Sequence, residues 1–322
     1  MESLQRFEDL PLSPEIMRGI KDLEFTELFP IQAQAIMPLL DGKDVIGQAQ
    51  TGTGKTAAFG IPMLERLQRN QRQVQGLILV PTRELAIQVA DHLNQFSKYT
   101  PMRAVPIYGG ESIQKQINTL RHGIQIVVGT PGRVIDHMKR GTLRLNTVKV
   151  VVLDEADRML DMGFRDDIDY ILARVPRNRQ ISLFSATIDA SVMEIARKYM
   201  DNPEKILISK DEIALPQITQ LYTVVNPREK FDVLCRLIDE ENIKRAIVFC
   251  KTREGTARLA NKLRHYGYDA EAIHADLSQA QREVILNAFR NRQIQLLVAT
   301  DVAARGLDIE GITNILNYDI PF

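Results

Sequence analysis

Short apolar runs of strand length alternate with stretches of helical periodicity along nearly the whole chain of 322 residues. A strand buried on both faces reads as a continuous apolar run, whereas a covering helix places apolar residues three or four positions apart. This alternation predicts an α/β architecture in which parallel sheets are covered by helices. The pattern restarts after a polar stretch at residues 209–216. The sequence therefore predicts two α/β domains in tandem.

The apolar runs locate the expected strands. In the first domain they begin at Asp44, Gly76, Arg103, Ile124, Lys149 and Gln180. In the second domain they are L-Y-T-V-V (221–225), R-A-I-V-F-C (245–250), Y-D-A-E-A-I-H (268–274), I-Q-L-L-V-A-T (294–300) and I-T-N-I-L-N-Y-D (312–319). Between them lie helical patterns such as Leu85, Val89, Leu93 and Phe96, whose spacing gives one buried face.

Composition places the chain among globular proteins, with 44% apolar and 25% charged residues. No apolar run approaches the roughly 20 residues that a membrane helix needs, and the acidic start does not resemble a secretory signal. Cys235 and Cys250 could form one disulfide, but reduced buried thiols are the expectation, and with them a cytoplasmic location.

Charge argues against long-range attraction to nucleic acid. Lysine plus arginine numbers 41, and so does aspartate plus glutamate. Fourteen of each sign follow residue 215, which leaves 27 of each (41 − 14) before it. Because neither half is basic, any nucleic-acid binding must come from a local groove with a few arginines.

The sharpest motif is A-Q-T-G-T-G-K-T, Ala49 to Thr56, between an expected strand and helix. The glycines let backbone amides close around phosphate oxygens, Lys55 would reach the β and γ phosphates, and the Thr56 hydroxyl would hold Mg²⁺. A glycine-rich turn before an amphipathic helix is the alternative, because the strict pattern has glycine at position 49. The residues expected to hold the nucleotide here are Gln50, Thr51, Gly52, Thr53, Gly54, Lys55, Thr56 and Ala57.

A second motif, Asp154-Glu155-Ala156-Asp157, follows the apolar run K-V-V-V-L. Carboxylates at the carboxyl end of a parallel strand stand where such sheets bind ligands. Asp154 can hold Mg²⁺ through water, and Glu155 can orient the water that attacks the γ phosphate. An acidic helix start is the alternative explanation, because the helix dipole favours it.

Together with these motifs, several others appear in the order and spacing of one family. They are P-T-R-E-L-A (81–86), the Gly109-Gly110 pair, T-P-G-R (130–133), S-A-T (185–187), V-F-C-K-T (248–252), Q-A-Q-R (279–282) and A-T-D-V-A-A-R-G-L-D (299–308). From its first residues to its last, the chain resembles DEAD-box RNA helicases. The sequences of its motifs are most similar to those of bacterial members.

The resemblance implies two RecA-like domains, which we place at residues 1–208 and 217–322 with a linker at 209–216. It implies that ATP with Mg²⁺ and RNA bind together, and that short RNA duplexes are pried apart locally. In the family, Gln32 would read the adenine edge and Phe25 would stack on the ring. The segment departs from the usual motif at Glu24, Leu28 and Phe29, and Gln32 on an exposed helix face is the alternative.

The resemblance also implies which residues contact the RNA backbone without reading sequence. They are Thr82, Arg83, Gly109, Gly110, Thr130 and Arg133 in the first domain, and Lys251, Thr252, Arg282 and Thr300 in the second. For some of them a purely structural role is the alternative: Gly109 and Gly110 could form a turn, and Thr130 could cap a helix.

Further roles follow from the same resemblance. Ser185 and Thr187 would bond to the D-E-A-D segment and couple hydrolysis to domain movement, although Thr187 could simply cap a helix. Asp308 would contact the ribose, and Arg305 would anchor its loop near the γ phosphate. His274 is left out of the catalytic set, because a histidine that ends a strand is as often a structural residue.

In the family an arginine-rich helix that carries the arginine finger follows I-L-N-Y-D-I-P, and this chain ends at Phe322, before it. We therefore expect a piece of a longer ATP-hydrolysing RNA helicase, with a second domain that is incomplete at its carboxyl end. Two rival functions stay open. One is a DNA translocase of the same superfamily, and the other is an ATP-dependent RNA clamp that lacks turnover.

Overall fold

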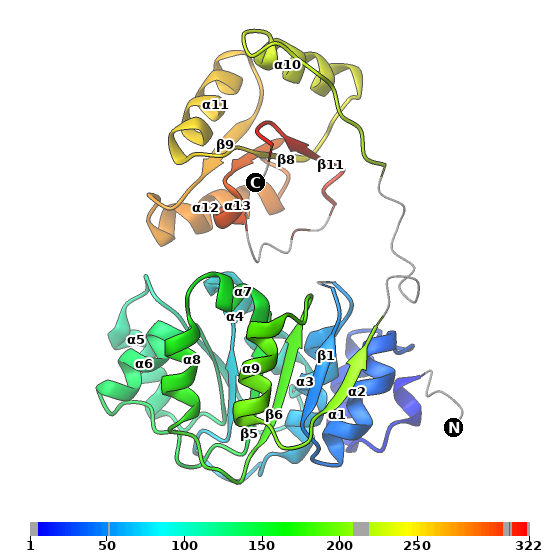
Figure 1. Cartoon of the computed structure of the whole chain (residues 1–322), viewed down its shortest axis with the longest axis vertical. Helices are drawn as coiled ribbons and strands as arrows, with labels where there is room; N and C mark the ends of the chain where they lie inside the picture. Colours follow the sequence, from blue (N-terminus) through cyan, green and yellow to red (C-terminus); the bar gives the residue numbers. More distant parts are fainter. Residues whose placement is uncertain (1–5, 51, 209–218, 305–308, 310, 321–322) are drawn as a thin grey trace. The chain divides into compact units, whose positions relative to one another are not determined.

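A computed structural model of the chain describes residues 6–50, 52–208, 219–304, 309 and 311–320. The chain divides into two compact units, Met1–Leu215 and Pro216–Phe322. Each unit is built on its own parallel sheet (Figure 1). The two-domain α/β prediction is therefore confirmed, whereas the expected linker at residues 209–216 lies outside the described residues.

The first unit holds a seven-stranded sheet with the order β3-β4-β2-β5-β6-β1-β7. All its strand pairs are parallel. Its strands are β1 Val45–Gln48, β2 Gly76–Leu79, β3 Ala104–Ile107, β4 Ile126–Gly129, β5 Val150–Asp154, β6 Gln180–Ser185 and β7 Glu204–Leu207. Because neighbouring parallel strands end at the same edge, the loops that follow them gather along one edge of the sheet.

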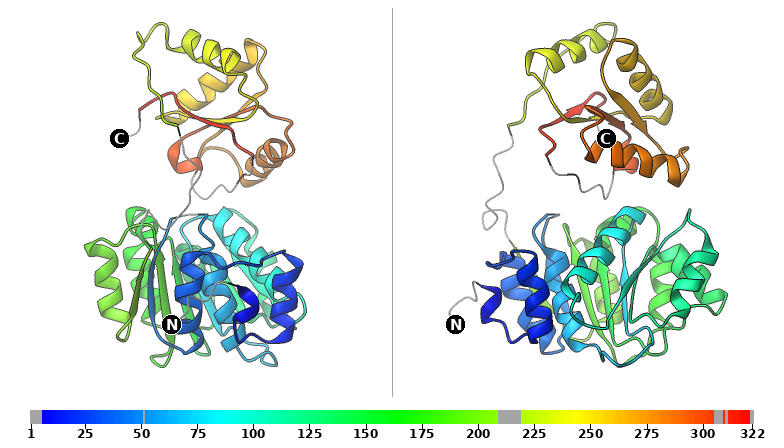
Figure 2. Two further views of the ribbon diagram at one scale, coloured as in Figure 1. Left: turned by 90° about the vertical axis from the view of Figure 1, so that its right-hand side faces the viewer. Right: turned by 180° about the vertical axis from the view of Figure 1, so that it is seen from behind.

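Helices cover both faces of this sheet, as Figure 2 shows for the blue and the green helices. The helices of the first face are α1 Pro14–Asp22, α2 Pro30–Leu40, α3 Lys55–Arg66 and α4 Arg83–Phe96, preceded by the short η1 Phe7–Asp9. The helices of the second face are α5 Ile113–Arg121, α6 Pro131–Lys139, α7 Ala156–Asp161, α8 Arg165–Leu172 and α9 Ala190–Tyr199. Alternate residues of β2 enter opposite cores: Ile78 packs with α3 and α4, whereas Leu77 and Leu79 pack with the helices of the second face.

The second unit holds a four-stranded parallel sheet with the order β11-β8-β10-β9. Its strands are β8 Ala246–Phe249, β9 Ala270–Ile273, β10 Leu296–Ala299 and β11 Asn314–Asn317. Its helices are α10 Lys230–Glu240, α11 Arg253–His265, α12 Gln279–Arg290 and α13 Asp301–Ala304. One core packs α10 and α11 on the sheet, and another packs α12 and α13 on it.

Local sequence signals fix several helix starts. Thr82 and Asp189 accept hydrogen bonds from the backbone amides of Leu85 and Val192 at the starts of α4 and α9. Ser278 and Gln281 form a reciprocal capping box at the start of α12. Ten of the eleven predicted strands are present.

The strand predicted at L-Y-T-V-V is wrong. Residues 221–226 form neither helix nor strand, and Leu221, Tyr222 and Val224 are at least 86% exposed. An alternating apolar pattern favours a strand only where a neighbouring edge supplies hydrogen bonds and a core covers one face, and these residues have no strand partner. The short edge strand β7 was not predicted, because only Ile206 of its four residues is buried.

Candidate functional site

The phosphate loop joins β1 to α3 at the strand-end edge of the first unit. Gly52 and Gly54 both have φ of 81°, in the left-handed region that glycine adopts without strain. Lys55 is the first residue of α3, and its buried Nζ donates a hydrogen bond 3.0 Å long to the carbonyl of Ala49. The loop thus curls around its own lysine at the positive end of a long helix, which suits a phosphate group.

The other residues of the loop complete this shape. The Thr53 hydroxyl donates to the Gln50 carbonyl at 2.7 Å, and Thr53 and Ala57 are buried. Thr56 is half-buried as the second residue of α3. Thr51 lies outside the described residues.

Gln32 ties the preceding segment to the phosphate loop. It is 1% exposed, so the exposed-helix alternative is wrong. Its Oε1 accepts from the Phe29 amide at 2.9 Å, and its Nε2 donates to the Gly54 carbonyl at 3.0 Å. An amide offers two donors and two acceptor sites, so one hydrogen and one lone pair stay available for a base edge.

Two aromatic residues flank this segment. Phe25 lies with its ring centroid 6.0 Å from that of Phe7 and 6.1 Å from that of Phe96. Phe29, which the sequence presented only as a departure from the family motif, is 55% exposed. A Cβ on Gly54 would lie 3.0 Å from its ring, so Phe29 borders the phosphate loop. The place of Phe29 beside the phosphate loop is seen only from this contact in the folded structure.

Asp154 and Glu155 stand at the end of β5, two strands away from β1 in the sheet. Both are buried. Burial raises the pKa of Asp154, although the nearby Lys55 charge opposes the rise. Burial and the Asp154 charge raise the pKa of Glu155, while Arg158 and Lys55 oppose this. The phosphate loop and the carboxylate pair therefore interact, as a nucleotide site requires.

Glu155 carries two marks of a functional position. Its φ of 51° lies in the left-handed region, which costs a non-glycine residue about 1–3 kcal/mol. Its buried Oε2 has no hydrogen-bond partner among the described residues, and Arg158 Nε is 3.7 Å away. A buried carboxylate oxygen without a hydrogen-bond partner, beside Asp154, fits a site for a water or for hydrated Mg²⁺.

The S-A-T segment at the end of β6 bonds to the D-E-A-D segment as expected. The Asp157 amide donates to the Ser185 hydroxyl at 3.2 Å, and both the amide and the hydroxyl of Thr187 donate to Asp157 Oδ2, at 2.9 and 2.8 Å. Burial alone would raise the pKa of Asp157, but the bonds from Thr187 and Ser185 lower it. The capping alternative for Thr187 is wrong, because α9 begins at Ala190 and is capped by Asp189.

Four of the six residues expected to bind RNA in the first unit meet at one turn. Gly110 has φ of 90°, and a Cβ there would lie 2.3 Å from Arg83 Nη1. Gly109 faces the same guanidinium, because a Cβ on Gly109 would lie 3.9 Å from Arg83 Nη2. Arg133 Nη1 donates to the carbonyl of Glu111, the next residue, at 3.2 Å. Two cations and two bare glycines thus form one surface.

The remaining two residues are helix N-caps. Thr82 caps α4 through its hydroxyl, 3.3 Å from the Leu85 amide. Thr130 precedes α6 but makes no side-chain cap hydrogen bond, so the helix start does not account for its side chain. Both follow strands of the same sheet, β2 and β4.

In the second unit, Lys251 and Thr252 follow β8 and Thr300 follows the neighbouring strand β10, whereas Arg282 lies on α12, which follows β9. Thr252 caps α11, and the Lys251 amide donates to Asp319 Oδ2 at 2.9 Å. Arg282 Nη2 donates to the carbonyl of Ala303 at 2.5 Å, and the Ala303 amide donates to Thr300 Oγ1 at 3.3 Å. Lys251 and Thr252 form one small cluster after β8, and Arg282 and Thr300 form another through Ala303.

Five further residues of this unit were named from the sequence: His274, Arg305, Asp308, Cys235 and Cys250. His274 Nδ1 lies 3.9 Å from Asp276 Oδ2 and has no hydrogen-bond partner among the described residues. Arg305 and Asp308 lie outside the described residues. Cys235 and Cys250 are free thiols, as predicted.

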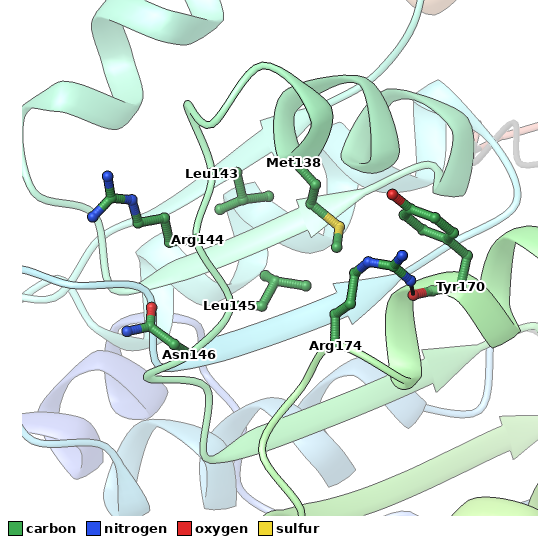
Figure 3. Close-up of a pocket in the computed structure, with 7 residues that line it drawn as sticks. All are labelled: Met138, Leu143, Arg144, Leu145, Asn146, Tyr170 and Arg174. Atoms are coloured by element: carbon green, nitrogen blue, oxygen red, sulfur yellow. Dashed lines mark hydrogen bonds between the residues drawn. The ribbon is translucent and has the colours of Figure 1, made fainter.

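Two pockets lie at the opposite edge of the first sheet. One of about 310 Å³ is lined by Met138, Leu143, Tyr170 and Arg174 among others (Figure 3). Arg174 stacks 3.4 Å from the Tyr170 ring and donates to its carbonyl, so its guanidinium is already used. A second pocket, of about 400 Å³, shares Leu143. Its lining residues 72–74, 124, 141–144, 146 and 147 precede strands, whereas the site described above follows strands.

A glycine-rich phosphate loop, a carboxylate pair and a helix-bound lysine on one parallel sheet define a nucleotide-binding protein of the P-loop class, here followed by a second parallel-sheet unit. Two family models match the chain: that of the DEAD/DEAH box helicases over residues 29–195 and that of the helicase conserved C-terminal domain over residues 229–322.

Among its relatives, the DEAD-box ATP-dependent RNA helicase CshA of Geobacillus kaustophilus is 51% identical over 98% of this chain and 68% of its own length. CshA of Bacillus cereus is 49% identical over 98% of this chain and 60% of its own length. The structure of Saccharomyces cerevisiae Dbp5 bound to RNA and ADP BeF3 superposes with a TM-score of 0.88 at 35% identity, over 98% of this chain and 81% of that one.

The chain belongs to the DEAD-box family of ATP-dependent RNA helicases, which are ATP-hydrolysing enzymes with tandem RecA-like domains. The two CshA relatives are bacterial, as the motif sequences predicted. Within the described part of the chain, every helix is too short or too polar to cross a membrane.

Proposed function

We propose that this protein hydrolyses ATP in response to RNA and uses the reaction to separate short RNA duplexes locally. One observation carries the proposal: the nucleotide residues and the arginine pair at Gly109 and Gly110 lie along the same strand-end edge of one sheet. A nucleotide and a sugar-phosphate strand bound there would both contact the first unit directly.

The nucleotide residues have distinct tasks in this proposal. Lys55 neutralises the β and γ phosphates, leaving the Ala49 carbonyl that it now contacts. Thr56 and Asp154 hold Mg²⁺, which when bound supplies positive charge for the developing negative charge on the phosphates. Glu155 Oε2, which is buried and has no hydrogen-bond partner among the described residues, accepts a hydrogen bond from the attacking water, aligns it and takes its proton.

Coupling between hydrolysis and RNA follows from the contacts of Asp157. Thr187 and Ser185 connect the loop after β6 to the residue two positions beyond Glu155. Any shift of the carboxylate pair on phosphate release is therefore passed to the S-A-T loop. RNA recognition in this scheme is independent of sequence, because arginine forks, hydroxyls and glycine amides contact phosphate and sugar rather than base edges.

ATP turnover by the purified protein tests the proposal, measured alone, with single-stranded RNA and with DNA of the same sequence. We expect RNA to stimulate turnover and DNA to have little effect. Equal stimulation by both would support the rival DNA translocase. Nucleotide-dependent retention of RNA without turnover would support the rival clamp. The two free cysteines agree with work in a reducing compartment such as the cytoplasm.

A further inference from the structure

A glutamine is the only described residue of α5 that is buried. Gln116 is 4% exposed, whereas the rest of the helix is exposed or half-buried. A buried amide without partners costs free energy, so a helix that buries a glutamine instead of an apolar residue gains something specific from it. The hydrogen bonds of Gln116 show what it holds.

The Gln116 amide bridges the two sides of the arginine surface. Its Nε2 donates to the carbonyl of Tyr108, the residue before Gly109, at 2.9 Å, and to Glu111 Oε2 at 3.4 Å. Its Oε1 accepts from Arg133 Nη1 at 3.3 Å. One side chain therefore contacts residues on both sides of the Gly109-Gly110 turn and also the arginine that reaches this turn from α6.

His137 fixes the direction in which Gln116 points. It is fully buried, its Nε2 lies 3.1 Å from Gln116 Oε1, and its Nδ1 lies 2.9 Å from the Thr142 hydroxyl. Burial and the Arg133 charge lower the pKa of His137 below its ordinary value of 6.5, which keeps the ring neutral. A neutral ring with hydrogen on Nε2 donates to Gln116, and the single hydrogen of the Thr142 hydroxyl is then shared between Nδ1 and the His137 carbonyl, which lies 3.1 Å from the hydroxyl oxygen. If the Gln116 amide were flipped, its NH₂ group would face the Arg133 guanidinium and His137 Nε2, which are both donors.

We propose that Gln116, oriented by His137, is a positioning residue for RNA binding: it holds Arg133 and the Gly109-Gly110 turn in one fixed geometry. The inference rests on the proposed RNA function and deepens it. The residues of this network come from the β3–α5 segment, α5, α6 and the loop after α6, whereas the phosphate loop follows β1 and the carboxylate pair follows β5. Substitutions in this network should therefore change RNA affinity and leave nucleotide affinity unchanged.

Fluorescence anisotropy of a labelled oligouridine, with a nonhydrolysable ATP analogue present, tests the proposal on the whole chain. We expect Gln116→Ala to weaken RNA binding by about tenfold, the loss typical of hydrogen bonds to a charged group. Affinity for the ATP analogue should stay unchanged. Gln114→Ala is the matched control, because Gln114 is exposed two positions earlier on the same helix, and it should bind RNA normally.

A second pair of variants keeps the test decisive if Gln116→Ala fails to fold. His137→Leu removes the donor to Gln116 and should weaken RNA binding, whereas His137→Gln places an amide donor near the position of Nε2 and should restore most of it. If the role of His137 were purely structural, RNA affinity would vary among the variants with melting temperature and not with the presence of a hydrogen-bond donor at position 137. Normal RNA affinity in folded Gln116→Ala or His137→Leu overturns the inference.

Arg133→Ala sets the scale and separates the two proposals. If the unsubstituted protein binds no RNA, the proposed function fails and the inference fails with it. If the unsubstituted protein binds RNA, and Arg133→Ala weakens binding but neither Gln116→Ala nor His137→Leu does, only the positioning role is lost.

Discussion

Glu155 combines a strained backbone with a buried carboxylate whose Oε2 has no hydrogen-bond partner among the described residues. Neither feature favours the folded state. The pKa of this carboxyl is raised by burial and by Asp154, so its ionised form opposes folding at neutral pH. Such costs persist where a binding site uses them, which agrees with a role in aligning water.

Glu155→Gln should therefore stop hydrolysis while raising stability. The amide keeps the shape, cannot accept the water's proton, and removes a buried charge. We expect ATP and Mg²⁺ still to bind, and the melting temperature of the nucleotide-free first unit to rise by about 2–4 °C, which corresponds to ~1 kcal/mol for a unit of this size.

The pH dependence has a defined sign. Because the folded-state pKa of Glu155 is raised above its ordinary value of 4.5, its destabilising effect is present at neutral pH. As pH falls through the raised value toward 4.5, both states bind the proton and the advantage of Glu155→Gln should vanish. The exposed Glu27→Gln serves as control. A normal turnover rate in Glu155→Gln contradicts the assigned role.

Gln32 offers a second test at the level of one residue. Its amide already binds the Phe29 amide and the Gly54 carbonyl, which leaves one donor and one acceptor in a fixed orientation. Adenine presents a matching N6 donor and N7 acceptor, whereas guanine presents two acceptors there. Gln32→Ala should therefore reduce the preference for ATP over GTP, measured as the ratio of the two dissociation constants.

Gln34→Ala is the control for this test, because Gln34 is exposed on the same helix and should leave the ratio unchanged. Equal affinity of the unsubstituted protein for ATP and GTP would refute the adenine role of Gln32. Loss of affinity for both nucleotides in equal measure would show that Gln32 only supports the phosphate loop.

At the scale of elements, three neighbouring strands, β5, β6 and β1, lead into the carboxylate pair, the S-A-T loop and the phosphate loop. Register places Asp154 opposite Phe184 and Gln48 opposite Ser185. The Gln48 side chain donates to the Ala186 carbonyl at 3.1 Å. The S-A-T loop is thus bonded to the strand that leads into the phosphate loop and to the helix that follows the carboxylates.

Thr187→Ala should separate hydrolysis from unwinding. It removes one of the two hydrogen bonds from Thr187 to Asp157 Oδ2 and leaves the carboxylate pair and Lys55 in place. We expect RNA-stimulated ATP turnover to persist and the rate of separating a short labelled duplex to fall about tenfold, as for a lost bond to a charged acceptor. Thr187→Ser keeps the hydroxyl and should restore unwinding. Equal unwinding by all three proteins would exclude this coupling.

Sequence patterns locate the regular elements well because a strand buried on both faces needs a continuous apolar run. Contacts between distant segments are another matter. That Phe29 borders Gly54, or that Gln116 meets His137, follows from how α2, α5 and α6 pack, and no spacing in the chain encodes it. The wrong strand at 221–225 has the same cause, because its pattern contains no information about a pairing partner.

The site could be predicted to a similar degree. Motif residues that act through their own backbone turn or helix end, such as Gly54 and Lys55, were placed from the sequence because the local geometry is set by local residues. The unpaired state of Glu155 Oε2, by contrast, depends on side chains that arrive from elsewhere in the chain.

At the scale of the whole molecule, a formal net charge of zero decides how RNA is captured. The charges are balanced in each half of the sequence, so the far field is weak and binding depends on contacts at short range. Four candidate cations face RNA in the proposal: Arg83, Arg133, Lys251 and Arg282. The number of phosphates neutralised is therefore small, and salt should weaken binding only moderately.

This expectation is quantitative. For single strands the logarithm of affinity falls with the logarithm of salt concentration by about 0.7 for each phosphate neutralised, so four cations give a slope of about −2.8 (0.7 × 4). Oligouridine titrations at several salt concentrations, with the ATP analogue present, measure it. Arg83→Ala should reduce the slope by about 0.7, whereas Arg264→Ala on α11 should not, because the exposed Arg264 side chain pairs with Glu271 of β9. A slope near −1.4 (0.7 × 2) would assign binding to the first unit alone, since only Arg83 and Arg133 would then neutralise phosphate, and would contradict the RNA role of Lys251 and Arg282.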